Sequence, residues 1–184
     1  MRLVCFGDSN TYGYDPRSFF GGRYPAESRW TDLLVEMTGW EVVNLGQNGR
    51  EIPAGAGSLA GLPRRDDLLV VMLGSNDLLC HPRFTAGNAA ARMEQFLNTL
   101  PPCRVLLVAP PPMVIGEWVT EERLLSESAA LAGEYESLAR RLDIWFADAG
   151  QWGVELTFDG VHFTEDGHRA FAKGIQEAIL CSLD

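Results

Sequence analysis

The chain has 184 residues, an ordinary share of apolar residues and a formal net charge of −10. These values suit a single soluble domain, taken here as residues 1–184, and the acidic balance disfavours nucleic acid and anionic membranes as partners. No apolar run is long enough to cross a bilayer. The first run, Leu3–Phe6, is too short for a signal peptide, so we expect a cytoplasmic protein.

Short apolar runs alternate with longer helical patterns along the chain. The runs expected to form strands are Leu3–Phe6, Glu41–Leu45, Leu68–Leu73, Arg104–Ala109 and Ile144–Phe146. The expected helices are Ser28–Thr38, Ala86–Leu100, Glu121–Leu142 and Thr164–Leu180. Several strands are nearly all apolar, as in parallel sheets that are buried on both faces. The alternation predicts a doubly wound α/β sandwich.

Local signals mark some of the helix ends. Ser28 and Thr164 are candidate caps at the starts of two helices, and Gly39 is a stop signal for the first of them. Gly133 is expected to weaken the long helix that contains it. Polar loops follow the strands, at the edge where doubly wound sheets bind ligands. Catalytic or binding residues are therefore expected in those loops.

Ser9, Asp159 and His162 are candidates for nucleophilic catalysis. A serine hydroxyl is a poor nucleophile unless a base takes its proton. An imidazole can accept a proton from a serine and return it to a leaving group, so His162 can serve as that base. Asp159, three residues earlier, can orient the ring and stabilise imidazolium. The side-chain amide of Asn76 can donate a hydrogen bond to an oxyanion, and so can the backbone N–H of Gly49.

Each of these residues also has a simpler structural explanation. Ser9 or Asp8 can cap a helix, Asn76 can form a turn, and Asp-x-x-His can be a capped loop. Gly49 can be a loop glycine, and Gly46 is its rival as an oxyanion donor. Their joint order and their placement after strands favour a serine hydrolase. The other histidines, His81 and His168, have no aspartate three residues before them and are interpreted as structural or surface residues.

These segments resemble the SGNH hydrolases, the GDSL-type esterase and lipase superfamily. Gly7-Asp8-Ser9 is similar to the nucleophile block, Gly49 to the glycine block, Gly74-x-Asn76-Asp77 to the asparagine block, and Asp159-x-x-His162 to the acid–base block. The resemblance implies a three-layer α/β/α sandwich with a parallel, flavodoxin-like five-stranded sheet and no mobile lid. It also implies an oxyanion hole from Ser9, Gly49 and Asn76, with Asp8 and Asp77 as supporting residues.

The segment from Cys5 to Tyr14, together with Arg29-Trp30 and Pro110–Pro112, looks most like the bacterial arylesterase and acyltransferase branch. Asn10 replaces the leucine of the family name, and we expect little effect because that side chain is not catalytic. The stretch from Met113 to Glu122 is short beside the loops of some arylesterases, which leaves the pocket shape open. The candidates for an apolar pocket are Tyr12, Tyr14, Trp30 and Trp118, with core filling as the alternative.

We therefore expect a serine esterase that hydrolyses short acetyl or aryl esters through an acyl-enzyme, with acyl transfer to alcohols as a related activity. Carbohydrate O-acetylesterase and lysophospholipase or thioesterase activities are alternatives within the superfamily. A metal-dependent phosphoesterase is a remote alternative: Asp8, Asn76, Asp77, Asp159 and His162 could be ligands, but no Asp-x-His follows the first strand. A non-catalytic binding module is disfavoured because all four blocks are intact.

The expected partner is a small-molecule ester, and oligomerisation rests on the resemblance alone. No metal or other cofactor is expected. The cysteines are scattered without a Cys-x-x-Cys or Cys/His cluster, so they predict free thiols rather than a zinc site.

Overall fold

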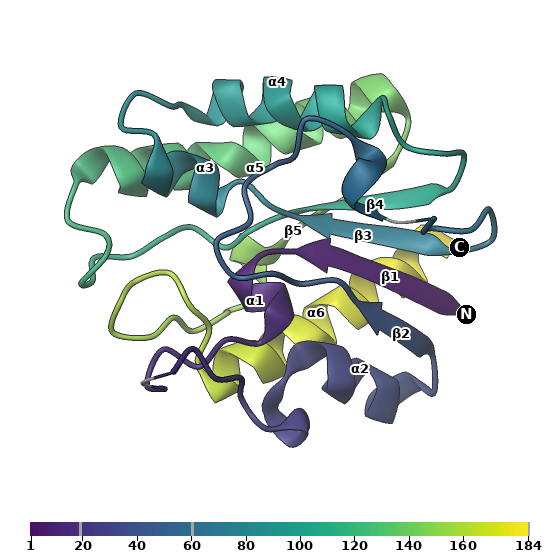
Figure 1. The fold of residues 1–184 in the computed structure, drawn as a ribbon, viewed down its shortest axis with the longest axis horizontal. Helices are drawn as coiled ribbons and strands as arrows, with labels where there is room; N and C mark the ends of the chain where they lie inside the picture. The colour runs from purple at the N-terminus through teal and green to yellow at the C-terminus, as the bar shows by residue number, and fades with distance from the viewer. Residues whose placement is uncertain (19, 60, 184) are drawn as a thin grey trace.

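The computed structural model describes residues 1–18, 20–59 and 61–183, which form three layers in Figure 1. Within these residues, five parallel strands make one sheet in the order β2-β1-β3-β4-β5. The strands are β1 (Arg2–Gly7), β2 (Glu41–Asn44), β3 (Leu68–Met72), β4 (Arg104–Ala109) and β5 (Trp145–Asp148). The predicted parallel sheet is confirmed, and each predicted strand end lies within one or two residues of the observed one.

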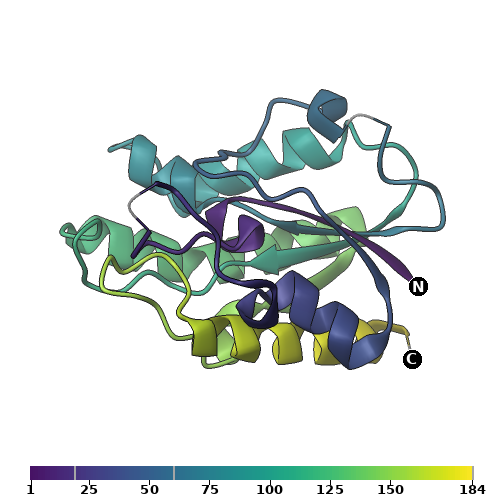
Figure 2. The ribbon, with the colours of Figure 1, turned by 60° about the horizontal axis from the view of Figure 1, so that its bottom comes forward.

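Helices cover both faces of the sheet, as Figures 1 and 2 show. The α4 and α5 helices (Ala86–Leu97 and Glu122–Leu142) lie on one face, and α2 and α6 (Trp30–Thr38 and Glu165–Leu183) lie on the other. This arrangement explains the continuous apolar run of β3, because both of its faces are buried.

The strand β3 divides its side chains between two cores. Leu69 and Val71 belong to the core that contains residues of α4 and α5. Leu68 and Val70 belong to the core that contains residues of α2 and α6. Successive side chains of a strand point to opposite faces, so a strand between two helical layers is apolar at every position.

The start of α2 differs from the prediction. The helix begins at Trp30, and residues Ala26–Ser28 form a separate 3-10 turn, η1. The Ser28 hydroxyl donates to Glu165 Oε2 at 2.8 Å, so it links two segments instead of capping the helix. The prediction that Ser28 caps the helix is therefore wrong. The prediction that the helix stops at Gly39 is confirmed, because Gly39 is its C-cap in the left-handed conformation.

The other predicted helices are present with shifted ends. Thr164 caps α6 as predicted, since its hydroxyl oxygen accepts the Gly167 N–H at 2.9 Å. The α4 helix ends at Leu97, earlier than predicted, with Asn98 as its C-cap. The α5 helix continues through Gly133 without interruption. The remaining 3-10 turns of the described residues are η2 (Ala56–Leu59) and η3 (Ala149–Gln151).

Two short helices were not predicted. The α1 helix (Ser9–Tyr12) follows β1, and the α3 helix (Ser75–Cys80) follows β3. Both are too short to produce a readable hydrophobic period, so the sequence suggested only loops. Each begins at the carboxyl edge of the sheet, which places Ser9 and Asn76 beside one another at that edge.

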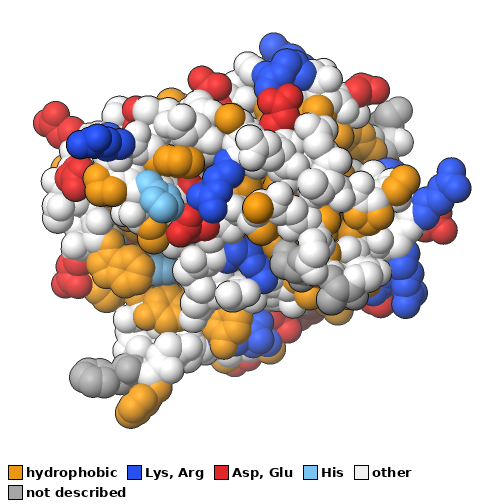
Figure 3. All heavy atoms as spheres, turned by 45° about the horizontal axis from the view of Figure 1, so that its top comes forward, with side chains coloured by type: hydrophobic (Ala, Val, Ile, Leu, Met, Phe, Trp, Pro, Cys, Tyr) orange, Lys and Arg blue, Asp and Glu red, His pale blue; other side chains and the backbone are white. Residues whose placement is uncertain are grey.

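The face drawn in Figure 3 carries no large patch of positive or negative charge, because acidic and basic side chains lie next to one another. This agrees with the dispersed acidic residues of the sequence. None of the described helices combines the length and apolar character that a membrane span requires.

Candidate active site

A tight turn joins β1 to α1 and fixes Ser9. Asp8 Oδ1 accepts the Asn10 N–H at 3.0 Å and thereby caps α1. Gly7 is required here because a Cβ atom would lie 2.0 Å from Thr11 Oγ1. Burial raises the pKa of Asp8 to about 6 although the Asn10 N–H acts in the opposite direction. The turn leaves Ser9 as the first helical residue at the end of the strand.

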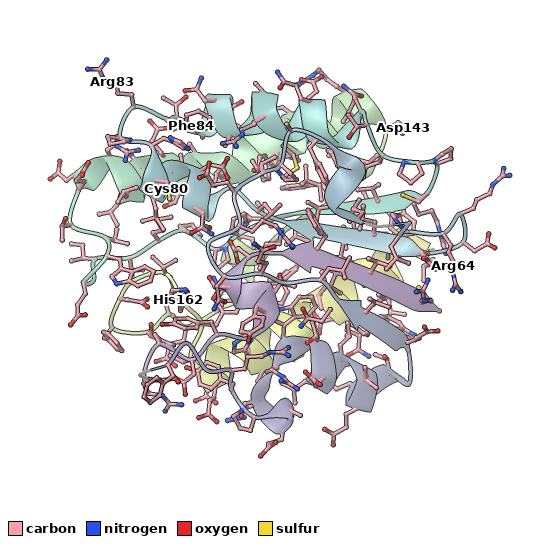
Figure 4. All side chains as sticks on the ribbon, viewed as in Figure 1. Arg64, Cys80, Arg83, Phe84, Asp143 and His162 are labelled. Carbon is pink, nitrogen blue, oxygen red and sulfur yellow. The ribbon has the colours of Figure 1, made fainter. Side chains whose placement is uncertain are left out.

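Ser9, His162 and Asp159 form a continuous line of hydrogen bonds. His162 Nε2 lies 2.9 Å from Ser9 Oγ, and His162 Nδ1 lies 2.6 Å from Asp159 Oδ2. Ser9 and His162 are 153 residues apart in sequence, and Figure 4 shows His162 at the edge where the strands end. A carboxylate that accepts Nδ1–H leaves Nε2 free to take a proton from the serine.

Asp159 is held as a carboxylate. Its Oδ1 atom accepts the N–H groups of Val161 and His162 at 2.9 and 3.0 Å, and the Thr157 hydroxyl at 2.8 Å. Burial by itself raises the pKa of Asp159, but hydrogen bonds from the His162 ring and the two N–H groups outweigh it and hold the pKa below the usual 3.8. The imidazole therefore faces a negative partner at neutral pH.

The candidate oxyanion donors are the backbone N–H groups of Ser9 and Gly49 and the side-chain amide of Asn76. All three residues line one cavity together with His162. Within the described residues, neither of the two N–H groups donates to a protein acceptor. Gly49 has φ +70°, which glycine adopts without strain. This set of donors suits an oxygen that becomes negatively charged.

Gly46 does not share this position. Its N–H donates to Asn44 Oδ1 at 2.8 Å, so it is already engaged. A Cβ atom at Gly46 would lie 2.1 Å from the backbone nitrogen of Tyr12. Gly46 therefore permits the loop after β2 to pack against α1, and Gly49 is the glycine that faces the cavity.

Arg50 holds the Gly49 loop against β1 and α3. Its Nη1 atom donates to the carbonyl of Gly7 at 2.8 Å and to the carbonyl of Leu45. Its own carbonyl accepts Asn76 Nδ2 at 3.1 Å. An amide nitrogen carries two hydrogens, so this bond orients the Asn76 side chain and leaves the second hydrogen for a ligand.

Asp77 provides a second link between α3 and the same loop. It accepts the Ile52 N–H at 3.0 Å and Arg92 Nη1 at 2.8 Å. Burial raises the pKa of Asp77 to about 6 despite these donors. Arg92 also pairs with Glu51, whose Oε2 atom lies 2.7 Å from His81 Nε2. His81 thus belongs to a half-exposed ion-pair network and does not line the cavity.

The cavity beside Ser9 has a volume of about 290 Å³. Its lining residues are Ser9, Tyr14, Gly21, Asn48, Gly49, Asn76, Trp118 and His162. The rings of Tyr14 and Trp118 contact the imidazole edge-on, with centroids at 4.7 and 5.0 Å. A larger surface groove of about 520 Å³ borders Phe158, but Ser9 does not line it, so we place the chemistry in the smaller cavity.

Two of the four candidate pocket residues lie elsewhere. Trp30 is 1 % exposed and packs on Phe171 with ring centroids 4.8 Å apart, so core filling describes it. Tyr12 lies beneath the Arg23 guanidinium, whose carbon is 4.5 Å from the ring centroid. The sequence could not separate these rings from Tyr14 and Trp118, because an aromatic side chain suits a pocket and a core alike.

The segment of residues 114–119 packs on the loop that carries Asp159. Three of its backbone N–H groups donate to the carbonyls of residues 158–160, each at 3.1 Å. Gly116 permits this approach, since a Cβ atom there would lie 2.4 Å from the carbonyl carbon of Asp159. The short stretch after Met113 therefore supports the loop that carries Asp159 and His162, and it brings Trp118 to His162.

Gly116→Ala is expected to lower the free energy of unfolding by about 1–3 kcal/mol, because the new methyl group collides with the backbone of the catalytic loop. Gly133→Ala is the matched control, since nothing lies within 4 Å of a Cβ atom there. In mid-helix this control should stabilise by about 0.5–1 kcal/mol. Urea unfolding of both variants measures the difference. Equal stability of the Gly116 variant and the wild type would contradict the close approach.

The remaining histidine is structural. His168 is fully buried, and its Nδ1 atom accepts the Trp30 N–H at 3.5 Å. Burial lowers the pKa of His168 to about 3, so the ring is neutral. Among the described residues, no group of three or more His, Cys, Asp or Glu side chains is placed to hold a metal ion.

Sequence reasoning missed three supporting residues: Asn10, Arg50 and Gly116. Asn10 was expected to matter little, but its side chain makes two buried hydrogen bonds to the loop that carries His162. The sequence signal for Asn10 was that a polar side chain stands where the family name GDSL has leucine. Arg50 had the signal of a cation directly after Gly49, the candidate oxyanion donor, whereas Gly116 had no signal in one sequence.

The α/β/α sandwich, with a serine, a histidine and an aspartate aligned at the carboxyl edge of its sheet, is the fold of the SGNH hydrolases. The chain belongs to the GDSL-like lipase/acylhydrolase family, whose sequence model matches residues 5–170. It is a carboxylic ester hydrolase.

Solved structures with the same fold cover nearly the whole chain. The aryl esterase of M. smegmatis is 27 % identical, with a TM-score of 0.82 and 98 % of each chain covered. A carbohydrate acetylesterase family member from Sinorhizobium meliloti is 28 % identical, with a TM-score of 0.83, and covers 97 % of this chain and 96 % of its own. No curated protein matches the sequence.

Proposed function

We propose that the protein is a serine esterase that cleaves short-chain acetyl or aryl esters through an acyl-enzyme at Ser9. The observation that carries this proposal is the line of hydrogen bonds from Asp159 through His162 to Ser9, with contacts of 2.6 and 2.9 Å. A serine whose hydroxyl bonds to an oriented imidazole is an activated nucleophile. The N–H groups of Ser9 and Gly49 and the second amide hydrogen of Asn76 meet the second requirement, a site for the oxyanion.

The reaction follows from this geometry. Ser9 Oγ attacks the ester carbonyl carbon while His162 Nε2 takes the hydroxyl proton. The carbonyl oxygen becomes an oxyanion and binds the N–H groups of Ser9 and Gly49 and the amide of Asn76. The tetrahedral intermediate collapses, and the departing alcohol takes the proton from His162. Water then attacks the acyl group with His162 as base, which releases the acid and restores Ser9.

The size of the cavity supports a small substrate. A volume of about 290 Å³ lies just below the roughly 300–1,000 Å³ of small-molecule sites. Tyr14 and Trp118 give one side an apolar, aromatic surface, which suits an aryl group or a short acyl chain. We therefore propose small-molecule esters with acetyl-sized acyl groups as the substrates, and transfer to alcohols as a side reaction.

An acetylated carbohydrate is the second candidate substrate. It is supported by the likeness to the carbohydrate acetylesterase family member from Sinorhizobium meliloti. It is also supported by the side chain of Asn48, which is exposed at the cavity and offers both a donor and an acceptor to sugar hydroxyls.

A hydrolysis panel tests the substrate class. It compares p-nitrophenyl acetate, butyrate, octanoate and palmitate with acetylated sugars and a thioester, and adds an alcohol to one set to detect acyl transfer. We expect kcat/KM to be highest for acetyl esters and to fall about tenfold or more by octanoate, because a filled cavity rejects further methylenes. Preference for the palmitoyl ester would refute the small-substrate proposal. A higher kcat/KM for acetylated sugars than for aryl acetates would select the second candidate.

A further inference from the structure

Asn10 connects the two halves of the active site. Its Nδ2 atom donates to the carbonyl of Val161 at 3.1 Å, and its Oδ1 atom accepts the N–H of Phe163 at 3.0 Å. A carbonyl can only accept and an N–H can only donate, so these partners fix the orientation of the amide. They are also the residues on either side of His162. Asn10 itself directly follows Ser9.

The backbone of Asn10 is buried and fixed by hydrogen bonds on both sides. The residue is 4 % exposed and lies within α1, with its N–H on Asp8 Oδ1. Its carbonyl accepts the Trp30 Nε1–H at 3.0 Å, and Trp30 is part of the core. The amide therefore extends from a fixed backbone to the catalytic loop.

The Asp159–His162 pair does not by itself place the imidazole relative to Ser9. Its hydrogen bonds lie within one loop and orient the ring inside that loop. Among the described residues, the hydrogen bonds that join α1 to residues 157–163 are the Ser9–His162 contact and the two bonds of Asn10. The Ser9–His162 contact changes during the proposed reaction, whereas the two Asn10 bonds can persist throughout it.

We propose that Asn10 is a positioning residue that sets the distance between Ser9 Oγ and His162 Nε2. This inference rests on the serine-esterase mechanism proposed above. The leucine of the family name could make neither bond. An apolar side chain at this position would leave the carbonyl of Val161 and the N–H of Phe163 without their partner. In this chain, two side-chain hydrogen bonds from Asn10 hold the loop that carries His162. A buried backbone group that loses its partner shifts or recruits water, and either response moves the adjacent ring.

The test is a double-mutant cycle between Asn10→Leu and His162→Ala, with kcat and KM measured for p-nitrophenyl acetate. Asn10→Leu should lower kcat about 10- to 100-fold, because misplacement of a catalytic group by about 1 Å has an effect of this size. KM should stay within about twofold, since Asn10 does not line the cavity. In the His162→Ala background, Asn10→Leu should change kcat by less than about twofold, because no imidazole remains to be positioned.

Thr99→Val is the matched control. Thr99 Oγ1 also makes one bond as acceptor, from the Ala56 N–H at 2.9 Å, and one as donor, to the carbonyl of Phe96 at 2.7 Å. It does not line the cavity. The control should lower the midpoint of thermal unfolding and leave kcat within about twofold of the wild type. Because Thr99 is exposed and Asn10 is buried, the unfolding midpoints of both variants are measured, and kcat is compared well below the lower midpoint so that reduced stability does not lower it.

The outcomes separate the two proposals. An equal loss of kcat from Asn10→Leu with and without His162, or no loss with His162 present, would overturn the positioning role. An unchanged kcat in His162→Ala alone would overturn the serine-esterase mechanism instead. If circular dichroism shows that Asn10→Leu does not fold, the cycle is run with Asn10→Ala, which also removes both bonds, and the same criteria apply.

Discussion

Ser9→Ala is expected to lower kcat for p-nitrophenyl acetate on the order of 10⁴-fold or more. The variant lacks the atom that would form the acyl-enzyme, and His162 then has no hydroxyl to deprotonate. The residual rate should reflect only the oxyanion donors and substrate binding, which the change leaves in place. KM should change little for the same reason. Initial rates of purified wild type and variant, with matched circular dichroism spectra, measure the effect.

Ser75→Ala is the control for this substitution. Ser75 resembles Ser9 in position, since it is buried and begins the short helix that follows a strand. It has no part in the proposed mechanism, so its kcat should stay within about twofold of the wild type. A fluorophosphonate should add its phosphonyl group, with loss of fluoride, to the wild type and to Ser75→Ala but not to Ser9→Ala, as measured by intact mass. Full esterase activity in purified Ser9→Ala would rule out the proposed mechanism.

Asp159→Asn is expected to lower kcat about 10⁴-fold while the loop keeps its shape. The asparagine oxygen can still accept the N–H groups of Val161 and His162. Its NH₂ group, however, would face His162 Nδ1 and donate to it. The ring would then carry its proton on Nε2, which could no longer accept the Ser9 proton. Steady-state kinetics at pH 7–8 measure the effect.

The same variant should change the pH dependence of stability. The pKa of Asp159 is held below its usual 3.8, so its ionised form stabilises the folded state at neutral pH. This contribution is fully present above the unfolded pKa and is lost as the pH falls through the folded pKa. The difference in unfolding free energy between wild type and Asp159→Asn should therefore shrink below about pH 4.

Asp148→Asn serves as the control for both measurements. Asp148 ends β5 and accepts the Gly150 N–H at 2.8 Å, so it too is a turn-forming aspartate near the carboxyl edge of the sheet. It contacts neither His162 nor the cavity. Its kcat should stay within about twofold of the wild type. A kcat of Asp159→Asn within tenfold of the wild type would show that the carboxylate is not needed to fix the ring.

The sheet was predictable because its strands are buried on both faces. A run such as Leu68–Leu73 has no polar position, which distinguishes a central parallel strand from a half-exposed one. The short helices α1 and α3 were not predictable, because one turn of helix shows no period. The Ser28 cap failed for another reason: its hydroxyl bonds to Glu165, a partner that only the tertiary structure brings near.

Ser9 and Asn76 could be proposed from the sequence because each lies in the turn after a strand, and parallel strands end at one edge. Asp159 and His162 lie farther beyond β5 and could be proposed from their Asp-x-x-His spacing. Neither rule could assign the residues that support them. Asn10 bonds to Val161 and Phe163, and Gly116 approaches the backbone of Asp159. Such contacts depend on how two loops pack, which spacing in one sequence does not encode. Trp30 shows the reverse error, since an aromatic ring near the nucleophile turn proved to be core.

The contact between Trp118 and His162 gives the protein an internal optical reporter. Among the described residues, Trp118 is the tryptophan whose ring contacts a histidine ring, and it is half exposed. Protonated imidazole quenches indole emission by accepting an excited electron, and the neutral ring does so far less. We therefore expect the Trp118 share of the intrinsic fluorescence to respond to the charge on His162 without a label. A stopped-flow trace of that emission could follow the proton as it arrives on the imidazole and leaves it.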